Sequence, residues 1–188
     1  ELAAKIERIN RLEFDRVGQT IGVDLIALRD TSGGPETFAA AAGKCAGSSP
    51  LPLVLLSDSS DCLESALEKV GDSKPLIGPG GADNLEEINT LAQKYGVPLI
   101  LRGETLEETA RLSEQAAGLG AEDLVLDTSP DNLPAALNDQ VIIRRQALKK
   151  NYRPLGYPTL VDLTGDEDGF SRALEAAVLI ATYAGIII

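Results

Sequence analysis

Apolar runs with strand character alternate along this chain with segments whose apolar residues recur at helical spacing. The seven runs that we expect to form strands cover residues 23–28, 51–56, 74–77, 97–101, 123–126, 157–163 and 185–188. Their starts lie about 23 to 34 residues apart, which is the length of one strand and one crossover helix. The alternation predicts an α/β fold with a parallel sheet, either doubly wound or closed into a (β/α)₈ barrel.

The strands at residues 51–56 and 97–101 are apolar almost throughout, which indicates burial on both faces and excludes an antiparallel sheet with one wet side. In the long connection between residues 127 and 157, a helix is expected at residues 135–150. Four glycines follow predicted helices and are expected to end them in the left-handed conformation: Gly71, Gly96, Gly120 and Gly185.

The two ends of the chain bear on the barrel prediction. The chain opens on a predicted helix at residues 2–12 and stops inside a predicted strand. A (β/α)₈ TIM barrel would therefore be recorded here without its first strand and its last helix. The length suits one domain, so we expect residues 1–188 to form a single barrel domain.

The composition of the chain excludes some classes of binding partner. The formal net charge of −12 argues against nucleic acid, whose phosphates need a basic surface. Neither an apolar run of about 20 residues nor a signal peptide is visible, so we expect no membrane partner and a cytoplasmic protein. The two cysteines, Cys45 and Cys62, lack the CxxC spacing and are interpreted as buried thiols in a reducing compartment.

The sequence contains no histidine. This removes Ser-His-Asp and Cys-His nucleophilic machinery, histidine-ligated zinc and any axial histidine for a haem or a corrinoid. We expect no metal site in this segment. Its chemistry must depend on carboxylates, hydroxyls, amides, arginines and backbone groups.

Polar residues stand where the predicted strands end, and carboxyl ends of parallel strands are where α/β folds bind ligands. Under one interpretation Asp127 caps a helix or loop and Arg102 neutralises an acidic neighbour. Under the other, the strand ends form a pocket for a flat, amide-rich ligand. Asp127 and Asn84 would then offer paired acceptors and donors, with Asp30 as a further anchor.

Basic residues concentrate in one stretch of this acidic chain. Five cations fall within ten residues: Arg144, Arg145, Lys149, Lys150 and Arg153. Cations near a helix C-terminus complement the helix dipole and are often only a solvated face. The alternative is a docking patch for an acidic surface of a partner or a neighbouring domain.

Residues 143–158 resemble the large (gamma) subunit of the corrinoid iron–sulfur protein of acetyl-CoA synthase systems. Residues 22–38, 51–57 and 122–127 are similar to the same family in the same order and spacing. The resemblance covers essentially the whole chain. It implies a TIM barrel from the middle of a three-part subunit.

In that family, a four-cysteine domain with a [4Fe–4S] cluster precedes the barrel and a cobalamin-binding domain follows it. The resemblance thus implies both cofactors in domains outside this sequence, and none bound by this segment. The subunit pairs with a smaller barrel subunit. With a methyltransferase as a further partner, it carries a methyl group on cobalt from a methyl-pterin to acetyl-CoA synthase, in anaerobic one-carbon metabolism.

Two roles follow for the barrel. It is expected to serve mainly as a scaffold within this methyltransferase system, with Arg144, Arg145, Lys149 and Arg153 docking the corrinoid domain or a partner subunit. The alternative comes from a likeness to pterin-binding barrels such as dihydropteroate synthase and methyltetrahydrofolate methyltransferase. There, the strand-six aspartate, in the position of Asp127, hydrogen-bonds the pterin ring.

If the alternative holds, the barrel is itself a pterin-binding methyltransferase site with Asp127, Asn84 and Asp30 as anchors. An aldolase-type barrel is disfavoured, because no strand interior carries a lysine for a Schiff base.

Overall fold

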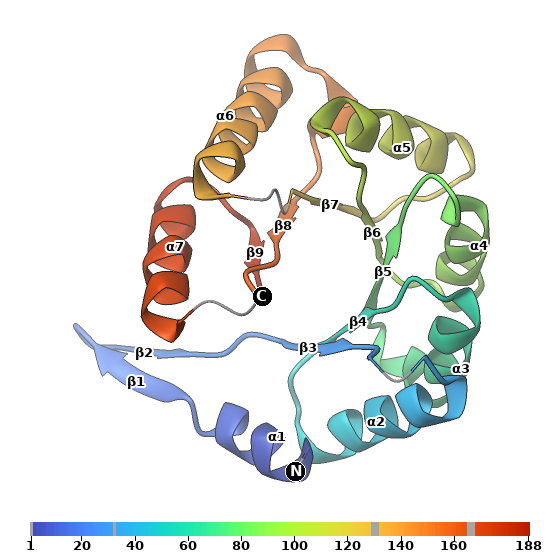
Figure 1. Cartoon of the computed structure of the whole chain (residues 1–188), viewed down its shortest axis with the longest axis vertical. Helices are drawn as coiled ribbons and strands as arrows, with labels where there is room; N and C mark the ends of the chain where they lie inside the picture. The colour runs from blue at the N-terminus through green and yellow to red at the C-terminus, as the bar shows by residue number, and fades with distance from the viewer. Residues whose placement is uncertain (1, 32, 129–131, 165–167) are drawn as a thin grey trace. The chain divides into compact units, whose positions relative to one another are not determined.

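The computed structural model describes residues 2–31, 33–128, 132–164 and 168–188 (Figure 1). Its larger sheet follows the order of the chain, and the pairs within β3–β4–β5 and within β6–β7–β8–β9 are parallel. The strands are β3 (Ile26–Arg29), β4 (Leu53–Leu56), β5 (Leu76–Gly80), β6 (Leu99–Leu101), β7 (Leu124–Asp127), β8 (Thr159–Val161) and β9 (Ile186–Ile187). All seven predicted strands are present, so the predicted α/β class with a parallel sheet is confirmed.

Burial explains why the apolar runs form strands. Every residue of β4, β6 and β7 is buried, and Leu55, Leu101 and Leu126 lie at 0% exposure. These strands are therefore covered on both faces, as their lack of polar alternation predicted.

The chain divides into two compact units, and the boundary passes through β5. The first unit contains residues 1–78 and 87–98, and the second contains residues 79–86 and 99–188. The helices wholly in the first unit are α1 (Leu2–Asn10), α2 (Pro35–Ser48), α3 (Ser60–Val70) and the short η1 (Gly71–Ser73). Helix α4 (Leu85–Tyr95) lies mostly in it as well. In Figure 1, α2 and α3 lie side by side next to β3 and β4.

A two-stranded hairpin in the first unit was not predicted. Strands β1 (Glu13–Arg16) and β2 (Gln19–Gly22) are antiparallel, with Phe14 opposite Ile21. The turn residues Val17 and Gly18 have φ angles of 51° and 78°, as two-residue hairpins that match the strand twist require. All eight strand residues are exposed, so no apolar run marked them in the sequence.

The second unit contains the elements that position the candidate sites. Its helices are α5 (Leu106–Gly118), α6 (Leu133–Lys150) and α7 (Gly169–Ala181), with the short η2 (Arg153–Leu155) between α6 and β8. In Figure 1, α6 and α7 both lie on the outer side of β8 and β9. Helix α6 begins two residues before the predicted start, because the Asn132 side chain accepts a hydrogen bond of 3.0 Å from the Ala135 amide and Pro134 suits a first turn.

Two of the four glycine predictions are correct. Gly96 and Gly120 have positive φ angles of 62° and 91°. Gly71 is right-handed with φ −57°, and a Cβ there would lie 2.9 Å from Cδ1 of Tyr95, so close packing accounts for the missing side chain. At Gly185 a Cβ would lie 3.0 Å from the Thr159 carbonyl oxygen. At Gly185 it is the close approach of a neighbouring backbone, and not a left-handed angle, that favours glycine.

None of the helices in the described ranges combines the length and apolarity needed to cross a membrane.

Candidate functional site

A pocket of about 430 Å³ opens at the carboxyl ends of β6 and β7, wholly within the second unit. It is lined by Arg102, Gly103, Glu104, Thr105, Leu106, Thr109, Asp127, Thr128, Asn132, Ala135 and Asp139. Its volume falls within the roughly 300–1,000 Å³ of small-molecule sites. The pocket therefore has the place and the size of a ligand site in a parallel α/β fold.

Asp127 and Arg102 form an ion pair on the wall of this pocket. Leu101 and Leu126 are paired in the β6–β7 register, so the next residues, Arg102 and Asp127, lie side by side at the strand ends. Arg102 Nε donates a hydrogen bond of 2.7 Å to Asp127 Oδ2, and Arg102 Nη2 pairs with the same oxygen. The Asp127 side chain is fully buried, whereas that of Arg102 is 36% exposed. The interpretation of Arg102 as a neutralising partner is confirmed.

Asn84 forms hydrogen bonds within the loop to which it belongs. Its Oδ1 accepts a hydrogen bond of 2.7 Å from the Gly81 amide, and its Nδ2 lies 3.5 Å from the Pro79 carbonyl oxygen. The described residues that line the Asp127 pocket do not include it. The structure therefore shows Asn84 bracing the loop between β5 and α4.

Asp30, the third predicted anchor, lies in the first unit just beyond β3. Its Oδ1 accepts from the Gly33 amide at 3.1 Å and its Oδ2 from the Ser57 hydroxyl at 3.2 Å. Burial, and then a hydrogen bond to Asp30, raise the pKa of the Cys62 thiol. Cys45 and Cys62 are both free and buried, so their interpretation as buried thiols is confirmed.

The carboxyl group of Asp139 also lines the Asp127 pocket, from α6. Burial, and then the nearby Glu107 carboxylate, raise the pKa of Asp139. Sequence reasoning missed Asp139. The signal was available, since it follows the capped start of α6 by two turns and so shares the face of Asn132 and Ala135.

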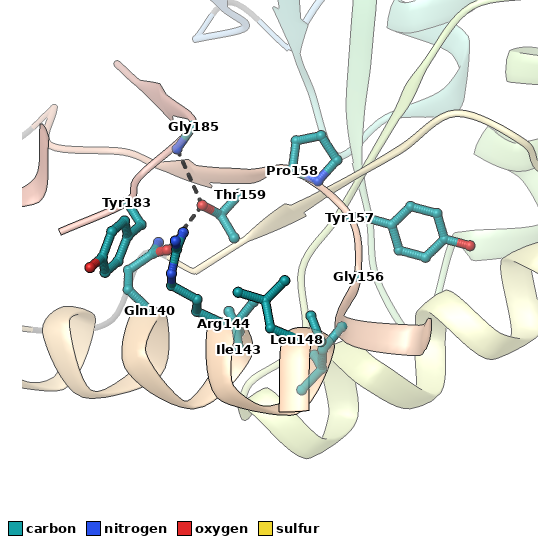
Figure 2. Close-up of a pocket in the computed structure, with 12 residues that line it drawn as sticks. Gln140, Ile143, Arg144, Leu148, Gly156, Tyr157, Pro158, Thr159, Tyr183 and Gly185 are labelled. Carbon is teal, nitrogen blue, oxygen red and sulfur yellow. Dashed lines mark hydrogen bonds between the residues drawn. The ribbon is translucent and has the colours of Figure 1, made fainter. Parts of the chain in front are cut away.

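A buried chain of hydrogen bonds connects β7, α6, β8 and the start of β9. The Gly185 amide donates to Thr159 Oγ1 at 3.3 Å, and Thr159 donates in turn to Gln140 Oε1 at 3.1 Å (Figure 2). Gln140 Nε2 then donates to Thr128 Oγ1 at 3.0 Å. The three residues are 2–6% exposed, so their polar groups need partners inside the protein; Thr128 Oγ1 also donates to the Leu160 carbonyl oxygen at 3.4 Å. No pattern in the sequence indicated this network.

The predicted basic patch lies on α6 and η2. In Figure 2 the Arg144 side chain lies beside Tyr183, with its guanidinium carbon 3.7 Å from the ring centroid. In the described ranges, no ion pair joins Arg144, Arg145, Lys149 or Arg153 to a carboxylate of this chain.

A second pocket, of about 210 Å³, adjoins the basic patch. Its lining includes residues 156–158 before β8, Thr159 at the start of β8 and Gly185 before β9, so it lies at the amino ends of these strands. Asp127 ends β7 at the carboxyl side of the same parallel set. The patch and the Asp127 pocket thus lie at opposite ends of the strands, which the sequence did not indicate.

The donors for the implied cofactors can be checked against this chain. A [4Fe–4S] cluster needs about four thiolates, whereas the sequence has two cysteines, one on α2 and one on α3. Among the described residues, no three His, Cys, Asp or Glu side chains cluster as a metal site would require. The two cysteines do not supply the thiolates of a [4Fe–4S] cluster.

Comparison with known proteins gives one family. The profile of the CO dehydrogenase/acetyl-CoA synthase delta subunit family, CdhD, matches residues 1–188. The corrinoid/iron–sulfur protein large subunit of Moorella thermoacetica is 38% identical over 188 residues, covering 100% of this chain and 42% of the relative. The acetyl-CoA decarbonylase/synthase complex subunit gamma of Methanothermobacter thermautotrophicus is 36% identical over 200 residues, covering 100% and 43%. The chain thus spans less than half the length of these relatives.

Solved structures with the same fold include dihydropteroate synthases. The Thermus thermophilus enzyme, in complex with 6HMPPP, superimposes with a TM-score of 0.64 at 18% identity, covering 98% of this chain and 80% of that one. The Yersinia pestis enzyme with a pterine-sulfa conjugate gives 0.63 at 13% identity, covering 99% and 79%. At this identity the likeness shows the fold alone. It confirms the prediction of the TIM-barrel class.

Proposed function

Because this chain belongs to the CO dehydrogenase/acetyl-CoA synthase delta subunit family, we propose that it is the barrel domain of a corrinoid iron–sulfur protein. In this proposal the barrel is a scaffold and docking surface in the cytoplasm. Its subunit carries a methyl group between a methyl-pterin and acetyl-CoA synthase. Cobalamin and the [4Fe–4S] cluster would be bound by domains other than the barrel.

The Arg102–Asp127 ion pair is the observation that carries the scaffold role. A pterin ring offers neighbouring N–H donors that suit both oxygens of one carboxylate. Here Asp127 Oδ2 accepts two donors from Arg102 of the same chain. A pterin would have to displace the arginine from a fully buried carboxylate, and breaking such a pair is costly.

Docking is assigned to the basic patch. Arg144, Arg145, Lys149 and Arg153 belong to an exposed region of a chain whose net charge is −12. Cations that have no carboxylate partner within the described residues are suited to meet an acidic surface. The partners in this proposal are the smaller barrel subunit, the methyltransferase and acetyl-CoA synthase.

Calorimetric titration of the protein with methyltetrahydrofolate tests the scaffold role. We expect no binding tighter than about 1 mM by the unaltered protein, a level that corresponds to about 4 kcal/mol. Arg102→Met, which frees the Asp127 carboxylate, serves as the comparison. Micromolar binding by the unaltered protein, weakened at least about tenfold in Asp127→Asn, would overturn the scaffold role.

Size-exclusion chromatography of the assembled complex tests the docking role. The double substitution Arg144→Glu and Arg145→Glu should weaken assembly with the partner subunits and leave the fold of this chain intact. Lys44→Glu, an exposed cation on α2, is the matched control. Unchanged assembly of the double variant would contradict this role.

A second candidate function is direct pterin binding. The pocket of about 430 Å³ that includes Asp127 favours it, since a ring system would fit there. The dihydropteroate synthase structures in complex with pterin compounds support the same idea by fold analogy. The titration with methyltetrahydrofolate separates the two candidates.

A further inference from the structure

The second pocket, beside the Arg144–Tyr183 pair, has no role in methyl transfer as proposed above. We infer that it receives one apolar or aromatic side chain from an acidic segment of a partner subunit. We call it the anchor pocket. The inference rests on the proposed docking function and names the surface and the chemistry that docking would use.

The size of the anchor pocket selects its occupant. Its volume of about 210 Å³ is half that of the Asp127 pocket, and below the roughly 300–1,000 Å³ of sites for cofactors and drug-sized ligands. A single large side chain is the guest that suits such a space. Interfaces concentrate their binding energy in side chains of this kind that fill pockets.

The walls of the anchor pocket are apolar, and its polar floor is already satisfied. Ile143, Leu148 and Leu155 contribute apolar surface. Thr159 and Gln140 lie at the floor, but the Thr159 hydroxyl accepts from Gly185 and donates to Gln140 (Figure 2). Because these groups already have partners inside the chain, an apolar guest leaves no buried polar group without one.

The charge around the anchor pocket calls for acidic neighbours on the guest. No aspartate or glutamate occurs between Asp139 and Asp162, although this stretch holds all five cations of the basic patch. Arg144 itself lines the pocket, and Arg145 and Lys149 follow on the same helix. A guest flanked by carboxylates would meet complementary potential, whereas a basic segment would be repelled.

Arg144 keeps its hydrogen-bond donors available in this arrangement. Its guanidinium group stacks 3.7 Å from the centroid of the Tyr183 ring. Stacking uses the flat face of the guanidinium group and leaves the N–H groups in its plane, where a carboxylate can bind two of them. The pair thus forms a flat rim with an anion-binding edge.

Tyr183 occupies a backbone position that favours glycine. Its φ angle is 80°, and the Ala184 amide donates to the Leu179 carbonyl oxygen at 3.2 Å, as at a helix end closed by a left-handed residue. Tyr183 as a whole residue is 56% exposed, so burial in this chain does not account for a tyrosine there. A left-handed tyrosine carries backbone strain, and such strain gathers at functional sites.

Titration of the protein against each purified partner subunit in turn, by calorimetry, tests the inference. Leu148→Ser and Tyr183→Gly remove one wall and the rim of the anchor pocket, and Arg145→Glu reverses one charge of the patch. Each should weaken binding of one subunit at least about tenfold. Leu148 is 66% exposed and Gly suits the backbone at position 183, so the variants should remain folded. Thermal melts check this.

Two matched controls keep the test specific. Leu174→Ser removes an exposed leucine on α7 outside the anchor pocket, and Lys44→Glu makes a charge change on α2. Both should bind within about twofold of the unaltered protein, because exposed positions outside an interface core contribute little.

Each possible binding result supports or overturns a specific claim. If the unaltered protein binds a subunit and the three variants bind it equally well, the inference and the docking role of the basic patch are both overturned. If only Arg145→Glu weakens binding, the anchor pocket is not part of the interface, and the docking role of the basic patch stands. Concentration-dependent self-association that Leu148→Ser abolishes, measured by light scattering, would replace the partner with a second copy. Absence of binding to every subunit would overturn the inference and the proposed function together.

Discussion

Arg102 Nε donates a hydrogen bond of 2.7 Å to Asp127 Oδ2 from the strand next to it in the sheet. Each residue follows or ends an apolar strand, so the parallel register alone brings the two charges together. The pair lies where parallel α/β folds bind ligands, yet it satisfies the carboxylate from within. A barrel with this arrangement is suited to holding its own strand ends in place.

Arg102→Met should destabilise the protein by about 2–3 kcal/mol. The substitution leaves the fully buried Asp127 carboxylate without its cation, but the partial exposure of Arg102 puts the loss below the roughly 3–5 kcal/mol of fully buried pairs. Denaturant unfolding measures it. The double variant Arg102→Met/Asp127→Leu should recover most of the loss, and equal instability of both variants would contradict this account.

Gln140→Leu should lower the free energy of unfolding by about 2–4 kcal/mol. The buried Thr159 hydroxyl then loses its acceptor on Gln140, and the buried Thr128 Oγ1 loses the donor on Gln140. Adding Thr159→Val and Thr128→Val to Gln140→Leu should restore part of the stability, since apolar groups then face one another. The comparison is a mutant cycle by chemical denaturation. Strictly additive losses would show that the three residues do not act as one network.

Tyr183→Gly should be more stable than Tyr183→Ala by about 1 kcal/mol. Both variants lose the stack on Arg144, but only alanine keeps a Cβ at a φ angle of 80°. Thermal melts under the same conditions measure the difference. Equal stability of the two variants would mean that position 183 does not need the left-handed conformation.

Asp139→Asn should stabilise the protein at neutral pH, with a gain that shrinks as the pH falls. Burial raises the pKa of Asp139 above its ordinary 3.8, so the folded carboxyl binds its proton more tightly than the unfolded one. Its favourable contribution is present below the unfolded pKa and is lost as the pH rises through the folded pKa. Unfolding at pH 7 and at pH 3 checks this. The same gain at both values would contradict it.

The strands of the larger sheet and the helices between them could be predicted, because each is marked by a local pattern of apolar and polar residues. Residues 51–56 and 97–101 are apolar almost throughout, since β4 and β6 are buried on both faces. The β1–β2 hairpin was missed for the converse reason. It is exposed along its length, so only the turn at Val17 and Gly18 defines it.

The candidate sites were predicted less completely. Asp127 was placed correctly at a strand end, and Arg102 was recognised as a neutralising residue. Asn84 and Asp30 were expected beside Asp127 as ligand anchors. Asn84 bonds within its own loop, whereas Asp30 accepts from the Gly33 amide and from the Ser57 hydroxyl after the next strand. A strand end can be read from periodicity, whereas the direction and the partner of its side chain depend on neighbours distant in the sequence.

By itself, the sequence determined the order of strands and helices, the acidic charge with its basic stretch, and the likeness to one family, since these reside in local composition. Only the tertiary structure decided that Arg102 closes on Asp127, that Gln140 bonds both Thr128 and Thr159, and that Tyr183 meets Arg144 beside a pocket. The residues in these contacts lie far apart along the chain. Packing of the strands and helices is what brings them within bonding distance.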